Sequence, residues 1–261
     1  MYEYVAKQML IAANKADKWI KKIYETDFPV EIKKDNSPVT DADKGADDII
    51  RAYLGTIFKD AGFLTEESTD DGSRFSKKEI FIVDPVDGTK EFVSKNGQFT
   101  INIAYCVDHE VVAGVIRVPM HNVSYYAIKG QGAFRVEDGK EPVQIHVSRR
   151  KSGIRACCSI SHNNEAEEQF YNDHFNVIAG KPTPIGAARK FCLIAEGSYD
   201  LSVRFSSGTK EWDVAAGDII LTEAGGVMIE PDGEKMTYNR VDVYNRKGYI
   251  LANCIENAFL K

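Results

Sequence analysis

Apolar residues recur at three- and four-residue steps near the start of the chain. Between residues 2 and 24, the apolar positions are Val5, Met9, Ala12, Ala16, Trp19, Ile20 and Ile23. This spacing predicts an amphipathic helix whose opposite face carries lysines. The apolar side is too modest for a membrane anchor, so we expect this helix to pack on the protein core.

A second helix is expected after an extended, polar loop at residues 33–40. Pro38 disfavours helix at the residue before it, Ser37, so the loop precedes the helix start. The inward positions of this helix are Ala46, Ile49, Ile50 and Leu54. Short β-branched or aromatic runs then predict a largely antiparallel sheet. They lie at residues 63–65, 80–83, 99–107, 111–118, 124–128 and 132–136.

The pattern changes beyond about Ser148, where strand and helix signals alternate. Strands are expected at residues 154–159 and 175–178, with a helix at residues 164–174 between them. A helix at residues 212–224 ends at two glycines that suit a left-handed cap. Final strands are expected at residues 227–229 and 249–252. We predict two domains, an N-terminal α+β domain at residues 1–148 with an antiparallel sheet, and a C-terminal α/β domain at residues 149–261.

Composition limits the choice of partner. The chain has 261 residues, 43% of them hydrophobic, and a formal net charge of −6. Its length suits one large domain or two closely packed ones. No overall positive field exists to attract a nucleic acid polymer. The charge of a phosphorylated substrate would therefore have to be met locally, by metal ions, lysines and helix N-termini.

Cysteine usage points to a reducing compartment. The five cysteines include no C-x-x-C pair, and no apolar signal core is present, so we expect a cytoplasmic protein. Cys157 and Cys158 are interpreted as small buried hydrophobes rather than a redox pair. No apolar stretch reaches membrane-spanning length, so stable membrane insertion is not expected.

The most informative segment is the apolar run I-F-I-V followed by D-P-V-D-G-T at residues 84–89. We expect a buried strand to deliver Asp84 and Asp87 into a tight turn, where both carboxylates face one hard cation. The carbonyl of Val86 is a further oxygen ligand, and Gly88 allows close approach of the chain. The alternative is that D-P and D-G are turn dipeptides without a ligand.

One other acidic segment strengthens the metal interpretation. L-T-E-E-S places Glu66 and Glu67 after a short apolar strand, and a fourth candidate carboxylate, Asp213, stands at a helix start in E-W-D-V-A-A-G. Converging buried carboxylates imply protonation or bound metal. Oxygen-only ligands favour Mg²⁺, whereas histidine and cysteine spacings give no support to zinc. From the residues alone, Asp213 is better explained as a capping residue at the helix start.

Together these segments, with S-P-V-T-D-A-D at residues 37–43, resemble the inositol monophosphatase superfamily of lithium-sensitive, magnesium-dependent phosphatases. Their order and separation match over nearly the whole chain. The resemblance implies a layered α-β-α-β-α sandwich of the inositol monophosphatase and fructose-1,6-bisphosphatase type, combining α+β and α/β parts.

Within that superfamily the chain resembles the 3'(2'),5'-bisphosphate nucleotidases, which remove the 3'-phosphate from adenosine 3',5'-bisphosphate. The similar segments are K-K-D-N-S-P-V-T, D-G-T-K-E-F, S-I-S-H at residues 159–162 and R-K-F-C at residues 189–192. Ala187 and Ala188 depart from this pattern, which usually has serines. The absence of these two hydroxyls weakens the assignment of a nucleotide substrate more than it weakens the assignment of phosphatase activity.

The resemblance implies roles for individual residues. Glu66, Asp84 and the Val86 carbonyl would hold one Mg²⁺, and Asp84, Asp87 and Asp213 a second. Glu66 would also help hold a third, weaker ion. Asp43 and Thr89 would orient or deprotonate the attacking water, with Thr40 positioning Asp43. The residues implied or considered for substrate binding are Val86, Asp87, Gly88, Thr89, Asp213, His162, Lys190 and Lys33.

Alternatives remain open at this point. An inositol or sugar monophosphatase would use the same metals, a sensor would bind metal and nucleotide without turnover, and a structural protein would merely have acidic turns. Lys33 and Lys190 have an alternative as solvated charges, and His162 as a surface or cap residue. Glu67 and Asp41 are expected to lie next to the metal ligands without binding the metal themselves. Both a monomer and a homodimer are compatible with the sequence.

Overall fold

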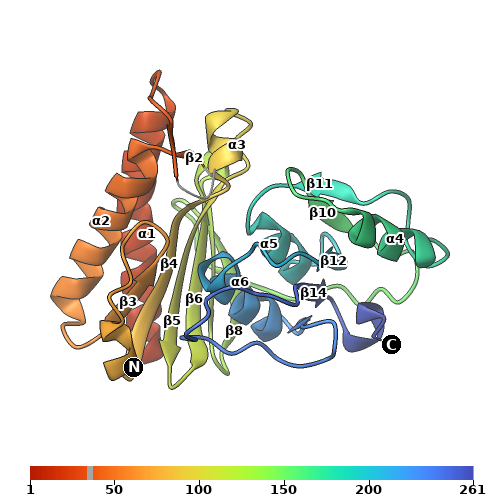
Figure 1. Ribbon diagram of the computed structural model, residues 1–261. Coiled ribbons are helices and arrows are strands. Elements are labelled where there is room, and N and C mark those ends of the chain that lie inside the picture. The colour runs from red at the N-terminus through yellow and green to blue at the C-terminus, as the bar shows by residue number, and fades with distance from the viewer. Residues whose placement is uncertain (34–37, 261) are drawn as a thin grey trace.

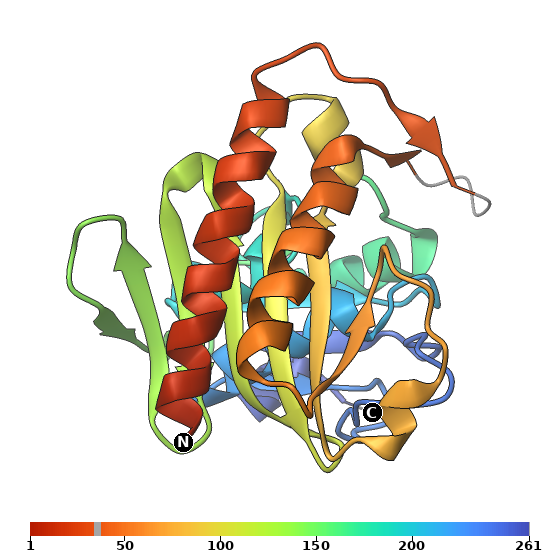
Figure 2. The same ribbon diagram turned by 90° about the vertical axis from the view of Figure 1, so that its left-hand side faces the viewer.

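Two long helices cover one face of a seven-stranded sheet (Figures 1 and 2). They are α1 (Tyr2–Tyr24) and α2 (Asp41–Ile57), and they pack against each other as well as on the sheet. The computed structural model describes residues 1–33 and 38–260. The side chain of Thr40 caps α2, because its hydroxyl accepts a hydrogen bond from the Ala42 amide at 3.1 Å.

The sheet has the strand order β3-β4-β5-β6-β7-β8-β9. β3 and β4 are parallel, and each later pair is antiparallel. The strands are β3 (Gly62–Thr65), β4 (Glu79–Asp87), β5 (Thr100–Val107), β6 (Glu110–Val118), β7 (Val123–Ile128), β8 (Gly132–Glu137) and β9 (Val143–Ile145). The predicted, largely antiparallel sheet is therefore confirmed.

Both faces of the sheet are buried. Along β4, Phe81 and Val83 pack against α1 and α2, whereas Ile80 and Ile82 pack against the opposite core. That core includes α5 (Arg189–Ala195) and α6 (Glu211–Glu223). Because side chains alternate along a strand, the continuous apolar run I-F-I-V suits burial on both sides.

Beyond α5 and α6 lies a second, smaller β layer (Figure 1). It contains β12 (Leu201–Arg204), β14 (Tyr249–Ala252) and β13 (Val227–Ile229), with the parallel pair β10 (Cys157–Ser159) and β11 (Thr183–Ile185) nearby. The outer helix α4 (Glu165–Asp173) packs there through Tyr171, whose hydroxyl donates to the Cys157 carbonyl at 2.9 Å. The predicted α-β-α-β-α sandwich is confirmed.

Smaller elements connect these layers. They are β1 (Glu31–Ile32) paired with β2 (Pro38–Val39), the five-residue helix α3 (Thr89–Val93), and the 3₁₀ helices η1 (Ser73–Ser76), η2 (Pro119–His121) and η3 (Ile255–Ala258). The predicted loop at residues 33–40 thus contains strand β2. Its residues 34–37, including Ser37 and most of the K-K-D-N-S segment, lie outside the described residues.

Three sequence predictions require correction. Residues 175–177 are turns and Ile178 forms only an isolated bridge with Ile154, because the His174 carbonyl accepts from the amides of Val177 and Ile178 and satisfies them locally. Of residues 154–159, only the last three form a strand. The D-P-V-D segment is not a tight turn, since β4 continues to Asp87 with an irregularity after Asp84, and the turn residue is Gly88, with a φ of 89°.

Strands β1, β9, β11 and β12, helix α5 and the 3₁₀ helices η1, η2 and η3 were not predicted from the pattern. The helix ending at Gly225 is confirmed, and this glycine has a φ of 94°. Among the described residues, no helix is long and apolar enough to cross a membrane. The cytoplasmic location and the division into domains at residues 148 and 149 stay predictions, as does the choice between monomer and homodimer.

Candidate metal and phosphate site

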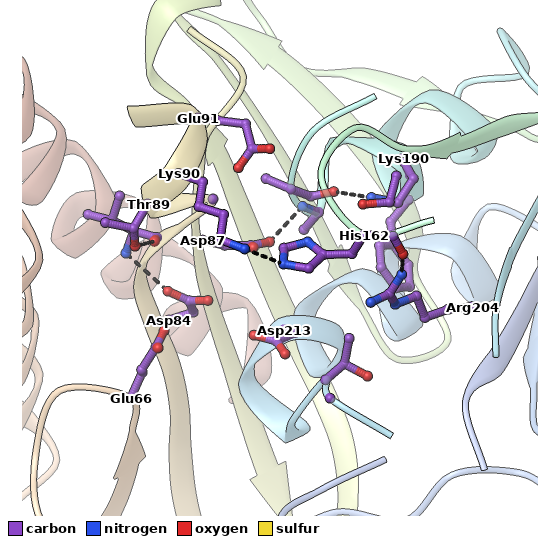
Figure 3. A pocket seen from close by; sticks show the side chains of 18 of the residues that line it. Glu66, Asp84, Asp87, Thr89, Lys90, Glu91, His162, Lys190, Arg204 and Asp213 are labelled. Carbon is purple, nitrogen blue, oxygen red and sulfur yellow. Dashed lines mark hydrogen bonds between the residues drawn. The ribbon is translucent and has the colours of Figure 1, made fainter. Parts of the chain in front are cut away.

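Three carboxylates from distant parts of the chain meet at one point. Oxygen atoms of Asp84, Asp87 and Asp213 all lie within 4.8 Å of one another. The first two come from the end of β4, and Asp213 comes from the first turn of α6 (Figure 3). Asp213 also caps its helix, because its Oδ2 accepts from the Lys210 amide at 2.7 Å. The capping interpretation of Asp213 is thus compatible with the metal one.

The electrostatics of this cluster favour a bound cation. Burial, followed by the charges of Glu66 and Asp87, raises the pKa of Asp84 well above its ordinary value. Burial also raises the pKa of Asp87 to about 6 and that of Asp213 to about 8. Like charges this close cannot all ionise without compensation, so the cluster must bind protons or a cation.

Glu66 lies beside Asp84 and lines the same pocket (Figure 3). Lys33 Nζ donates to Glu66 Oε1 at 3.1 Å and also pairs with Glu67. Lys33 is therefore bonded at the acidic end of the pocket. Burial raises the pKa of Glu67 to about 7. Glu67 is not among the residues that line the pocket, which agrees with its predicted place behind the ligands.

Asp43 and Thr89 form a hydrogen-bonded pair next to the cluster. Thr89 Oγ1 donates to Asp43 Oδ1 at 3.0 Å. The other Asp43 oxygen, Oδ2, accepts from the Thr40 amide at 2.8 Å and the Thr40 hydroxyl at 2.6 Å. Burial raises the pKa of Asp43. The positioning of Asp43 by Thr40 is therefore present in the structure.

Asp87 is fixed by groups from the neighbouring strand β5 and from the segment just before α5. Its Oδ2 accepts from the Ala188 amide at 2.6 Å and from Asn102 Nδ2 at 3.1 Å, with Thr100 Oγ1 at 3.4 Å. Ala187, just before, has a φ of 54°, a strained conformation for a residue other than glycine. Sequence reasoning missed Asn102 and Thr100, which look like ordinary strand residues.

The other end of the pocket is basic. Lys90, His162, Lys190 and Arg204 line it. Lys190 is buried, and its Nζ donates to the Ala187 carbonyl at 2.8 Å, while burial lowers its pKa. His162 Nε2 lies 2.9 Å from Lys90 Nζ, and burial lowers the pKa of His162, so its neutral ring accepts from the lysine.

Sequence reasoning missed Lys90 and Arg204 as pocket residues. Lys90 stands inside the D-G-T-K-E-F motif, directly after Thr89, so its position was a usable signal. Arg204 ends the short apolar strand β12, and an arginine closing such a strand is a weaker signal. The Arg204 guanidinium donates to the His162 carbonyl and lies 3.4 Å from Glu167 Oε1.

The pocket has a volume of about 370 Å³ and two electrically different ends (Figure 3). Glu66, Asp84 and Asp213 lie on the acidic side. Gly88 and Thr89 also line the pocket, and helix α3 begins at Thr89 as the motif suggested. This arrangement can hold a hard cation beside one anionic group and receive a second anion at the basic end.

Comparison with known proteins gives a consistent result. The model of the inositol monophosphatase family matches residues 1–258. A 3'(2'),5'-bisphosphate nucleotidase CysQ from Escherichia coli K12 is 34% identical over 247 residues, covering 93% of this chain and 97% of that protein. The CysQ of Salmonella typhimurium LT2 is 33% identical, with the same coverage.

Solved structures agree. CysQ from Bacteroides thetaiotaomicron, described as a bacterial member of the inositol monophosphatase family, superposes with a TM-score of 0.83 and 32% identity, covering 97% of this chain and 98% of the other. An IMPase from Thermotoga maritima has a TM-score of 0.78 and 26% identity, covering 97% and 91%. The chain belongs to the inositol monophosphatase family, and so to a family of phosphatases.

Proposed function

We propose that this protein is a Mg²⁺-dependent phosphomonoesterase that hydrolyses the 3'-phosphate of adenosine 3',5'-bisphosphate, giving AMP and phosphate. One observation carries the proposal: a single pocket joins a carboxylate cluster to a group of four basic side chains. A substrate with two phosphates needs both ends, whereas a monophosphate needs only the first. Relatives named as bisphosphate nucleotidases support the same substrate class.

The residues present suit Mg²⁺. The clustered ligand atoms of Asp84, Asp87 and Asp213 are all carboxylate oxygens, the donors that hard cations prefer. In this proposal Glu66, Asp84 and the Val86 carbonyl would hold one ion, and Asp84, Asp87 and Asp213 would hold a second. Glu66 would also contribute to a third, weaker site. When bound, Mg²⁺ would neutralise phosphoryl oxygens and lower the pKa of a coordinated water.

Asp43 and Thr89 handle the proton of the attacking water. The Thr89 hydroxyl donates to Asp43, which leaves a lone pair of Thr89 Oγ1 to accept from a water in the pocket. As that water attacks phosphorus, its proton passes to Thr89 Oγ1 while the Thr89 proton passes to Asp43. The bond from phosphorus to the 3'-oxygen breaks, that oxygen takes a proton from solvent water and leaves as the 3'-hydroxyl of AMP, and Asp43 then releases its proton to solvent.

The remaining residues position the substrate. Amides of Gly88 and Thr89 meet oxygens of the reacting phosphate, beside Val86, Asp87 and Asp213. His162 and Lys190, with Arg204 and Lys90, receive the 5'-phosphate or the base. Arg204 is suited to a phosphate because its planar guanidinium offers paired donors.

The alanines at 187 and 188 leave the backbone interactions in place. The Ala188 amide bonds Asp87, and the Ala187 carbonyl accepts from Lys190. Neither interaction needs a side-chain hydroxyl. The substitution of the usual serines is therefore expected to weaken substrate affinity without removing the reaction.

A substrate panel tests the proposal. Initial rates with adenosine 3',5'-bisphosphate, inositol 1-phosphate and fructose 1,6-bisphosphate in millimolar Mg²⁺ should show the highest kcat/KM for the nucleotide. Fructose 1,6-bisphosphate is the control for charge, because it carries two phosphates and no base. A preference for inositol 1-phosphate would refute the nucleotidase assignment. Nucleotide binding without phosphate release would indicate a sensor.

A further inference from the structure

Two side-chain hydrogen bonds cross the pocket from helix α3 to the segment at residues 159–162. Ser161 Oγ donates to Glu91 Oε1 at 2.5 Å, and Lys90 Nζ donates to His162 Nε2 at 2.9 Å. Lys90 and Glu91 are neighbours in α3, and Ser161 and His162 are neighbours in the other segment. Figure 3 shows Lys90 directed at His162, with Glu91 on the same helix. The two bonds therefore fix this segment relative to α3.

Glu91 is the more firmly held of the two α3 residues. Its relative exposure is 5%, whereas Lys90 is exposed. Its side chain packs closely on Gly186, since a Cβ added to that glycine would lie 3.0 Å from Glu91 Cγ. A carboxylate confined in this way offers Ser161 a fixed acceptor. Lys90 has a long, mobile side chain that loses more entropy on being held.

The segment that Ser161 belongs to carries part of the basic end. The main-chain carbonyl of His162 accepts from the Arg204 guanidinium. On the far side, Asn164 caps α4, and buried Glu167 accepts from the Phe205 amide at 2.9 Å. The basic end is thus assembled between α4 and α3, and the contact from Ser161 to Glu91 closes it on the α3 side.

We propose that Glu91 is a positioning residue that, by accepting from Ser161, holds His162 and Arg204 in place and sets the preference for substrates with a second phosphate. This inference rests on the proposed function. Without the contact between Ser161 and Glu91, the segment at residues 159–162 must become ordered when the substrate binds. The free-energy cost of this ordering falls only on ligands that bind at the basic end. The bond from Thr89 to Asp43 does not involve Glu91.

A matched pair of substrates isolates the effect. Adenosine 3',5'-bisphosphate and 3'-AMP share the reacting phosphate and the nucleoside, and they differ only in the 5'-phosphate. The ratio of their kcat/KM values therefore measures the contribution of the second phosphate. Wild-type protein should prefer the bisphosphate, and this comparison is made first. If wild type shows no preference, the proposed function fails, and the inference that rests on it is overturned too.

Variants then test Glu91 itself. Ser161→Ala and Glu91→Ala should each reduce kcat/KM for the bisphosphate about tenfold, mainly through KM, and leave 3'-AMP within about twofold. Ser161 is exposed, so its substitution should preserve the fold even if Glu91→Ala does not. Glu91→Gln keeps an acceptor oxygen for Ser161 and should retain most of the preference. Ser76→Ala, at an exposed serine whose hydroxyl donates to the Ser73 carbonyl of its own turn, is the control and should change neither rate.

A double-mutant cycle distinguishes the contact from two separate effects. If the contact is the cause, the double variant Glu91→Ala with Ser161→Ala should be no worse than either single variant. A wild-type preference that survives Ser161→Ala unchanged would overturn the inference while leaving the proposed function intact. Equal losses on both substrates, or additive losses in the double variant, would also overturn it.

Discussion

Thr89 and Asp43 are 46 positions apart in the chain, yet the Thr89 hydroxyl donates to the Asp43 carboxylate at 3.0 Å. The pair depends on the packing of α2 against the sheet, since Asp43 belongs to the first turn of α2 and Thr89 follows β4. Thr40, the N-cap residue of α2, donates to the second oxygen of Asp43 within the start of the same helix. The proposed proton acceptor is thus held by two elements at once.

The first prediction concerns this pair. Thr89→Val should reduce kcat by about 10²- to 10⁴-fold, the range typical of a lost general-base contribution. Thr89→Ser keeps the hydroxyl and is the matched control, with kcat within about tenfold of wild type. Steady-state kinetics at saturating Mg²⁺ measure both. Near-normal turnover by the valine variant would exclude Thr89 from the proton transfer.

The second prediction concerns Asp84. Asp84→Asn should lose nearly all turnover and the rise in Tm on adding Mg²⁺, because it removes the carboxylate proposed to bridge two ions. The metal-free variant should melt above metal-free wild type, since burial and neighbouring charges raise the pKa of Asp84 in the folded state. Thermal melts with and without Mg²⁺ test this. An unchanged Mg²⁺ effect on Tm would contradict the assignment.

The third prediction is a dependence of metal binding on pH. In the metal-free protein, the pKa of Asp87 is about 6 and that of Asp213 about 8, both above the ordinary 3.8. Carboxyls with raised pKa contribute stability below pH 3.8 that is lost as pH rises through about 6 and then about 8. Mg²⁺ competes with those protons, so its affinity should rise over the same interval.

The measurement for the third prediction is the shift in Tm caused by Mg²⁺ at about pH 5.5 and about pH 8.5. The shift should be larger at the higher pH. Asp213→Asn, which removes the carboxyl with the higher pKa of the two, should flatten the upper part of the dependence. A shift of the same size at both pH values would indicate that the cluster is not where Mg²⁺ binds.

Sequence patterns located the N-terminal half of the fold because its strands are buried on one or both faces and carry clear apolar runs. They failed at β11, where Pro184 interrupts the pattern of a short strand, and at α5, which has only seven residues. Arg204 was missed because a site residue at the end of a short strand carries no periodic signal. Asp213 could be identified only by resemblance, since a capping role explains it locally.

The role of Asp47 could not be predicted from the sequence either, where it is one of several acidic residues of α2. It is buried, with a relative exposure of 2%. Its Oδ2 accepts from Ser68 Oγ at 2.6 Å and from Arg51 Nε at 2.8 Å. Because Asp47 follows Asp43 by four residues, both carboxylates lie on one face of α2. The helix that holds Asp43 therefore also holds the loop that carries Glu66.

The fourth prediction follows from that arrangement. Ser68→Ala should weaken the activation of the enzyme by Mg²⁺ about three- to tenfold, because the loop carrying Glu66 loses its side-chain bond to α2. At saturating Mg²⁺, kcat should remain within about twofold of wild type, since Ser68 touches no reacting group. Thr69→Ala, at the exposed neighbouring position, is the matched control and should leave Mg²⁺ activation unchanged. Titration of activity with Mg²⁺ separates an effect on Mg²⁺ activation from an effect on kcat. A fall in kcat with an unchanged Mg²⁺ dependence would show that the contact between Ser68 and Asp47 serves something other than metal binding.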